Sequence, residues 1–269
     1  MPIYINDKQI QPLIFPAGEC HVRVSPEMVT PITAIKAWLH NAEDIMTLLL
    51  SVDAIRRLSP VSQIHLTIPY FPYARQDRVC NQGEALSVKV MADLINSLRC
   101  DRILIIDPHS DVTPALLNNC QVITQADIFA ESELKTELIK DNWALIAPDA
   151  GAEKKVLMMA QRLGLTDIFC ANKIRDTKTG NITATTFHDE VKDRKVLIVD
   201  DICDGGKTFI ELGKLLREKQ AKTVNLYVTH GIFSKGLQLL KLYLDHIYCY
   251  HTFSPIKEEK NDFLTVINN

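Results

Sequence analysis

The stretch LIVDDICDGGKTF, residues 197–209, decides the expected fold and the place of the candidate site. It opens with branched apolar residues, as a buried strand does, and continues with acidic residues and two glycines before a helical pattern begins. In open α/β sheets, ligands bind at the carboxyl ends of the strands, where helices begin. We therefore expect an α/β protein whose ligand site includes this stretch.

The same order of strand, polar loop and helix recurs along the chain. Short β-branched runs predict strands, and the longer amphipathic runs between them predict helices over a parallel sheet. The predicted strands are residues 33–39, 64–68, 102–106, 143–147, 196–199 and 224–228. The predicted helices are residues 42–58, 87–98, 126–139, 152–163 and 208–219. Short extended runs before residue 30 predict a small antiparallel meander.

The length predicts two domains. A single core stops growing near ~250–300 residues, so 269 residues fit two modest α/β halves. The polar segment 131–142 separates two comparable halves. We therefore predict an N-terminal domain over residues 1–141 and a C-terminal domain over residues 142–269.

Composition excludes several classes of function. The 30 Lys and Arg against 33 Asp and Glu give a net charge of −3, which argues against nucleic acid or an anionic membrane as a partner. The opening MPIYINDKQI lacks a signal-peptide pattern, and no apolar run approaches the ~18 residues that span a bilayer. The seven cysteines are scattered without a C-x-x-C pair, which fits neither a disulfide framework nor a zinc site. We expect a cytoplasmic protein.

The residue types in the stretch 197–209 suit a sugar phosphate. Glycines let backbone amides approach a phosphate, and a threonine hydroxyl lies at the helix start, where the dipole favours an anion. Two adjacent aspartates at the strand end can accept hydrogen bonds from neighbouring sugar hydroxyls. The alternative is a tight turn with an N-cap, but a bare turn does not require two acids at the end of the strand. The candidate binding residues are Asp200, Asp201, Asp204, Gly205, Gly206, Lys207 and Thr208.

Four segments together resemble one enzyme family. VDDICDGGKT resembles the phosphoribosyl-pyrophosphate-binding motif of type I phosphoribosyltransferase folds. IPYFPYARQDR (68–78), APDAGAEKKV (147–156) and FPAGECHVRV (15–24) resemble segments of ribose-phosphate diphosphokinases, also called phosphoribosyl pyrophosphate synthetases. The resemblance implies two tandem type I phosphoribosyltransferase-like domains with mainly parallel sheets, the first binding a nucleotide and the second a ribose phosphate.

This resemblance implies an enzyme that transfers the β,γ-diphosphate of ATP to the anomeric hydroxyl of ribose 5-phosphate. The products would be phosphoribosyl pyrophosphate and AMP. Such a reaction brings several phosphates together, so the site must supply cations and a metal, here Mg²⁺, and needs no covalent intermediate.

The family pattern implies which residues bind ATP. Arg75 and Arg78 are forked donors suited to the triphosphate, and Gln76 is suited to a base edge. Phe15 and Glu19 belong to the nucleotide site by the same pattern and would be presented by a neighbouring subunit, so that the active form is at least a dimer. The alternative for Phe15 is a core aromatic residue.

The family pattern also implies the metal ligands and the catalytic cations. His109 and Asp149 align with the magnesium ligands, and His109 also serves the ATP phosphates. Asp107 would orient His109, or else cap a helix. Lys173 and Arg175 align with a catalytic Lys-x-Arg on a mobile hairpin, where Lys173 would stabilise charge as AMP departs. The alternatives are a structural role for the histidine and an exposed polar loop for the two cations.

Departures from the family pattern leave alternatives open. Ala17 stands where the family commonly has Asp or Asn, so one hydrogen bond to adenine is missing. Gly205 and Lys207 replace the commoner loop residues, giving less bulk and more positive charge. This change could suit a diphosphate, so the second candidate acceptor is ADP-ribose, giving ADP-ribose pyrophosphate in NAD salvage. For Lys154 and Lys155 we expect a solvated helix face.

Two further alternatives have less support. A non-catalytic regulatory subunit of the family would keep the fold but lose the catalytic residues, whereas this chain retains them. A phosphoribosyltransferase would not need the segment around Arg75.

Overall fold

The computed structural model describes residues 3–175, 182–253 and 262–267, with only the backbone described at 173–175 and 182–184. The chain divides into two compact units, residues 1–124 and residues 125–269, which are described separately below. Within the described ranges, no helix is both long enough and apolar enough to cross a membrane.

The first unit is built on a six-stranded sheet with the order β2-β1-β5-β6-β7-β8. Strands β5, β6, β7 and β8 run parallel to one another, and β1 is antiparallel to both β2 and β5. The strands are β1 (Ile3–Ile5), β2 (Lys8–Gln9), β5 (Ile32–Ala37), β6 (Gln63–Ile68), β7 (Arg102–Ile106) and β8 (Cys120–Ile123). A separate antiparallel pair, β3 (Leu13–Ile14) and β4 (Cys20–His21), completes the predicted meander.

Helices cover one face of this sheet. They are η1 (Pro26–Met28), α1 (Ala42–Leu58), α2 (Ser87–Ser97) and α3 (Val112–Leu116). Alternate residues of β6 and β7 enter the core with the apolar sides of α1 and α2, whereas β5 exposes its other residues. Helix α1 has the predicted bounds, and its first turn is capped by Asn41, whose side chain accepts a hydrogen bond from Asp44 N at 3.0 Å.

The second unit has a six-stranded, fully parallel sheet with the order β10-β9-β13-β14-β15-β16. The strands are β9 (Ala144–Ala147), β10 (Ile168–Cys170), β13 (Lys195–Cys203), β14 (Thr223–Gly231), β15 (His246–Thr252) and β16 (Leu264–Val266). Nearly every residue of β13 and β14 is buried, because both faces of the sheet are covered.

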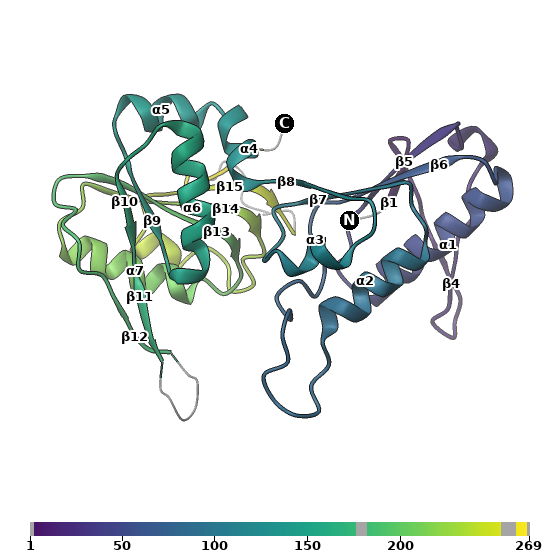
Figure 1. Cartoon of the computed structure of the whole chain (residues 1–269), viewed down its shortest axis with the longest axis horizontal. Coiled ribbons are helices and arrows are strands. Elements are labelled where there is room, and N and C mark those ends of the chain that lie inside the picture. Colours follow the sequence, from purple (N-terminus) through teal and green to yellow (C-terminus); the bar gives the residue numbers. More distant parts are fainter. Residues whose placement is uncertain (1–2, 176–181, 254–261, 268–269) are drawn as a thin grey trace. The chain divides into compact units, whose positions relative to one another are not determined.

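Alternate residues of each central strand of this sheet enter two different cores. Ala144 and Ile146 pack on the side of α7 (Lys207–Glu218), whereas Leu145 and Ala147 pack on the opposite side. That opposite side is covered by α4 (Gln125–Glu131), α5 (Leu134–Lys140) and α6 (Ala150–Leu163). Figure 1 shows α5 and α7 on opposite sides of β13 and β14. The prediction of two α/β halves with mainly parallel sheets is confirmed.

A two-stranded antiparallel hairpin, β11 (Asn172–Arg175) and β12 (Ile182–Thr186), follows β10. It projects away from the sheet of the second unit (Figure 1). A short 3-10 helix, η2 (Leu240–Leu242), lies in the connection between β14 and β15.

The division between the units differs from the predicted boundary at residue 141. It lies after Thr124, because the polar segment 131–142 contains the end of α4 and all of α5, and both helices belong to the second unit. The apolar residues of these helices, Phe129, Leu134 and Leu138, join a core with Trp143 at the start of β9. The sequence pattern missed this because the exposed sides of both helices are strongly polar.

Candidate functional site

The candidate nucleotide residues of the first unit follow two neighbouring strands. The segment with Arg75, Gln76 and Arg78 comes after β6, and His109 comes after β7. Since β6 and β7 pair in parallel, both segments leave the sheet at the same edge. The structure thus brings these four predicted residues to one end of the first unit.

The segment after β6 is held by backbone hydrogen bonds. Tyr73 has a positive φ of 62°, which makes a sharp turn, and Gln76 N donates to Tyr73 O at 2.9 Å. Gln76 O accepts a hydrogen bond from Val88 N of α2 at 3.3 Å. Arg75 and Gln76 are exposed, and the side chain of Arg78, whose Nε lies 3.8 Å from Asp77 Oδ1, is 82% exposed. Solvent-facing guanidinium groups on an anchored backbone suit an anionic ligand.

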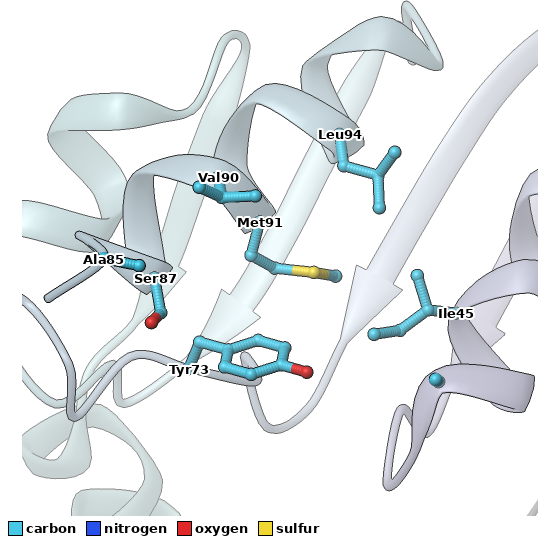
Figure 2. Close-up of a pocket in the computed structure, with 8 residues that line it drawn as sticks. Ile45, Tyr73, Ala85, Ser87, Val90, Met91 and Leu94 are labelled. Atoms are coloured by element: carbon cyan, nitrogen blue, oxygen red, sulfur yellow. The ribbon is translucent and has the colours of Figure 1, made fainter. Parts of the chain in front are cut away.

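An apolar hollow lies beside this segment. Its volume is about 380 Å³, and it lies between the start of α1, Tyr73 and one side of α2. Figure 2 shows Met91 and Ile45 pointing into it from the two helices, with the Tyr73 ring beside Met91. The predicted ATP residues do not line it in the described structure, so the hollow adds an apolar surface next to the polar segment.

The hairpin of β3 and β4 carries Phe15 and Glu19 at its turn. Phe15 N donates to Glu19 O at 2.8 Å, and the turn needs Gly18, whose φ is 88°. The Phe15 side chain is 45% exposed, so its alternative role as a core aromatic is wrong. Glu19 lines a hollow of about 450 Å³ against α1, with Met46 among the residues opposite.

The end of β7 places Asp107 and His109 differently. Asp107 is 3% exposed, with a positive φ of 39°, and its N–H donates to Ile123 O at 2.9 Å. His109 is exposed. Helix α3 begins only after Asp111, so the alternative in which Asp107 caps the next helix is wrong.

The candidate residues of the second unit gather at the carboxyl edge of its own sheet. Asp149 follows β9, the stretch from Asp200 lies at the end of β13, and Lys173 follows β10. These strands are neighbours in the order β10-β9-β13.

Asp149 is the N-cap of α6. Its Oδ1 accepts hydrogen bonds from Gly151 N at 2.9 Å and Ala152 N at 3.2 Å. The carboxylate therefore satisfies the first free amides of α6, so this helix end is not available to a phosphate.

The two aspartates at the end of β13 have different surroundings. Asp200 Oδ1 accepts a hydrogen bond from Asp201 N at 2.8 Å, and burial, followed by the charge of Asp201, raises the pKa of the Asp200 carboxyl well above its ordinary value. Asp201 is 5% exposed, and its Oδ2 lies 3.5 Å from Lys155 Nζ. Buried Gln125 donates to Asp200 O at 2.5 Å from the start of α4. Two neighbouring acidic groups with restrained backbones suit a pair of sugar hydroxyls.

The phosphate loop that follows has an open helix end. Gly206, with a φ of 76°, is the N-cap of α7, and no side chain caps this helix. The first amides of α7 are therefore available to an anion, in contrast to those of α6. On the other side of the loop, Ser234 Oγ donates to Asp204 Oδ1 at 2.6 Å and fixes the loop's first residue.

Lys207 is the first residue of α7, and its charge is partly balanced. Its Nζ lies 3.7 Å from Oε1 of Glu211, one helical turn on. Glu211 Oε2 also accepts a hydrogen bond from the hydroxyl of Thr185 at 3.0 Å. Thr185 stands opposite Lys173 in the β11–β12 register, so Glu211 links the hairpin to α7. The backbones of Lys173 and Arg175 lie in β11, and their side chains lie outside the described part of the chain.

The Asp149 carboxylate of the second unit is chemically suited to a magnesium ion shared with phosphates. Mg²⁺ prefers oxygen, keeps several waters and is usually held by one or two carboxylates plus substrate phosphates rather than by a protein cage. Asp149 is such a carboxylate. In the first unit, His109 carries an imidazole nitrogen, a poorer type of magnesium ligand. Within the described residues, no three His, Cys, Asp or Glu side chains form a metal-binding group.

Sequence reasoning missed three contributors to the site. They are Lys155, Ser234 and Glu211, which contact Asp201, Asp204 and Lys207. For Lys155 the expectation of a solvated face is wrong. Helical periodicity could have found it, because Lys155 precedes Val156 and lies four residues before Met159, both buried. No comparable local signal marks Ser234, which is thirty residues from its partner.

Comparisons with known proteins agree on one family. A model of the N-terminal domain of ribose phosphate pyrophosphokinase matches residues 9–98, and a phosphoribosyl transferase domain model matches residues 115–263. The ribose-phosphate pyrophosphokinase of Maricaulis maris is 32% identical, with 83% of this chain and 72% of that protein covered. The protein of the same name from Hyphomonas neptunium is 30% identical, with 79% and 68% covered.

A solved structure has the same fold. The phosphoribosylpyrophosphate synthetase from Mycobacterium smegmatis matches with a TM-score of 0.80 and 24% identity, covering 96% of this chain and 85% of that one.

Proposed function

The chain belongs to the ribose-phosphate pyrophosphokinase family, and from this premise we propose that it makes phosphoribosyl pyrophosphate and AMP from ATP and ribose 5-phosphate. The observation that carries the proposal is the carboxyl end of β13. There, two aspartates near the end of the strand are followed by a glycine loop and the uncapped N-terminus of α7. This arrangement suits a sugar with neighbouring hydroxyls and a terminal phosphate.

The second unit binds the acceptor in this proposal. Asp200 and Asp201 accept hydrogen bonds from the ribose hydroxyls, and Lys155 Nζ, 3.5 Å from Asp201 Oδ2, orients the second carboxylate. Amides of the segment from Gly205 to Thr208 receive the 5-phosphate, with the Thr208 hydroxyl at the helix start. Asp204 shapes the loop through Ser234.

The first unit binds ATP in this proposal. Arg75 and Arg78 donate to the triphosphate, and Gln76 reads the adenine edge from an anchored backbone. Phe15 and Glu19 complete the nucleotide site of a neighbouring subunit. Leu13, Ile14 and Phe15 are all exposed on one hairpin. Contiguous exposed apolar side chains favour burial against another protein surface, which supports a neighbouring subunit at this hairpin.

Lys173 and Arg175 stabilise the transferring diphosphate, with Lys173 donating to the charge that develops as AMP leaves. The anomeric hydroxyl attacks the β-phosphorus of ATP and loses its proton to solvent, the bond from that phosphorus to the α-β bridging oxygen breaks, and AMP departs. His109 and Asp149 would hold Mg²⁺, which neutralises phosphate charge when bound. We propose a cytoplasmic location and an assembly of at least two subunits, which a fully active monomer would contradict.

ADP-ribose remains the weaker candidate acceptor. A Cβ atom on Gly205 would lie 3.6 Å from the Lys235 side chain, so Lys235 borders the space left by the missing side chain. The Lys207 charge that would favour a diphosphate is paired with Glu211. Neither observation favours the larger acceptor, and the relatives' names support ribose phosphate.

The test is a product analysis with both acceptors. Purified protein receives MgATP with ribose 5-phosphate, with ADP-ribose or with neither, and AMP and the sugar product are measured by mass spectrometry. We expect acceptor-dependent AMP with ribose 5-phosphate and little with ADP-ribose. Lys173→Ala should lower kcat by roughly 10²–10³-fold with smaller changes in KM. Acceptor-independent AMP release, or none, would contradict the proposal.

A further inference from the structure

The connection after β14 is folded onto the phosphate loop. Ile232 N and Phe233 N both donate to Cys203 O, at 2.9 and 3.0 Å, and Ser234 N donates to Asp204 O at 3.2 Å. These bonds continue the contact between the two strands beyond the end of the sheet. The residues that follow Ser234 are therefore held beside the loop.

Two side chains from this connection lie against the two loop glycines. A Cβ atom on Gly206 would lie 3.0 Å from Leu240 Cδ2, which closes the loop from the core side. A Cβ atom on Gly205 would lie 3.6 Å from both Cδ and Cε of Lys235, at ordinary van der Waals distance. The methylene groups of exposed Lys235 thus lie over Gly205, which the anion must approach. The ammonium of Lys235 is one bond beyond Cε.

The other lysine of the loop is placed differently. Lys207 reaches along the first turns of α7 to Glu211, at 3.7 Å, so part of its charge is directed away from the open helix end. Lys235 comes from the facing segment, and no described ion pair engages it. The loop therefore receives a second cation that its own sequence does not contain.

We propose that Lys235 is a phosphate-binding residue of the acceptor site and contacts the 5-phosphate of ribose 5-phosphate. The inference rests on the proposed function and adds a specificity-determining residue to it. Backbone amides of the loop fix the phosphate's position, and a compact ammonium at its rim adds a charge-assisted hydrogen bond.

The experiment compares Lys235→Met with Lys192→Met. Methionine keeps a stem of similar length over Gly205 and removes the charge. Lys192 is an exposed lysine of the same unit that precedes β13, at the opposite edge of the sheet, so its variant matches the change in net charge. For Lys235→Met we expect the Kd of ribose 5-phosphate by calorimetry, and its KM, to rise about ten-fold or more. The KM of ATP and kcat should stay unchanged.

The outcomes separate the inference from the proposed function. Lys235→Arg should recover most of the affinity, and higher ionic strength should reduce the difference between Lys235→Met and the parent protein. If the parent binds ribose 5-phosphate and releases AMP but Lys235→Met behaves like Lys192→Met, the inference is wrong and the proposed function stands. A rise in the KM of ATP instead would also overturn it. If the parent neither binds ribose 5-phosphate nor uses it, both fall.

Discussion

Asp149 has two roles in this protein, as the observed cap of α6 and as a proposed magnesium ligand, and substitution can separate them. Asparagine caps a helix about as well as aspartate, whereas alanine does not. Asp149→Asn should keep the hydrogen bonds from Gly151 N and Ala152 N and lose the metal-binding charge. We expect it to remain close to the parent in urea unfolding while needing more Mg²⁺ for half-maximal AMP release.

Asp149→Ala should lose both functions. Its free energy of unfolding should fall by about 0.5–2 kcal/mol, as for other lost N-caps, in addition to the higher Mg²⁺ requirement. Equal Mg²⁺ requirements in the asparagine variant and the parent would leave Asp149 with only its capping role.

At single residues, the sequence predicts positions better than partners. The aspartates of β13 and the glycine N-cap of α7 can be read from a strand, two acids and two glycines in succession. The raised pKa of Asp200 and the pairing of Asp201 with Lys155 depend on burial and on a contact between elements, which no local pattern encodes.

At the level of elements, Glu211 joins the hairpin to the phosphate-loop helix. It accepts a hydrogen bond of 3.0 Å from the hydroxyl of Thr185 in β12, and it forms an ion pair with Lys207 of its own helix. Glu211→Ala should remove this link. If the free energy of local opening of the hairpin falls by about 1 kcal/mol, the β12 amides should exchange roughly five-fold faster. Hydrogen–deuterium exchange of peptides over 182–186 measures this.

Glu218→Ala provides the matched control for that measurement. Glu218 is an exposed residue near the end of the same helix, so its loss changes the charge of α7 without touching β12. Equal exchange of β12 in both variants would show that the Glu211 contact does not hold the hairpin.

Hydrophobic periodicity predicts the helices and strands that are buried on one face or on both faces. QIHLTI of β6 alternates, as its half-covered sheet requires, and the continuous apolar run of β13 reflects two covered faces. The predicted helix 126–139 is two helices, because the Ser132 hydroxyl bonds to Phe129 O at 2.7 Å, where α4 ends. Strand β15 was missed, since its half-buried alternate residues are polar and aromatic.

At the scale of the whole molecule, each unit has its own hydrophobic core and its own buried thiols. Burial raises the pKa of Cys100 in the first unit to about 11 and that of Cys249 in the second to about 12. Such thiols react with alkylating reagents only when their unit opens, because the thiolate is the reactive form. Exposed Cys80 should react first and report the reagent's activity.

Ribose 5-phosphate should therefore protect the two cores unequally if it binds the second unit. At one hundred times its Kd, a ligand stabilises the folded state by ~2.7 kcal/mol, which would slow opening-dependent labelling of Cys249 about 100-fold. The labelling of Cys100 should keep its rate, because the first unit contributes ATP-binding rather than acceptor-binding residues in this assignment. Pulsed alkylation followed by peptide mass spectrometry measures both thiols in one sample, with unphosphorylated ribose as the control ligand. Protection of Cys100 with no protection of Cys249 would move the acceptor site to the first unit, and equal protection would show that the units open together.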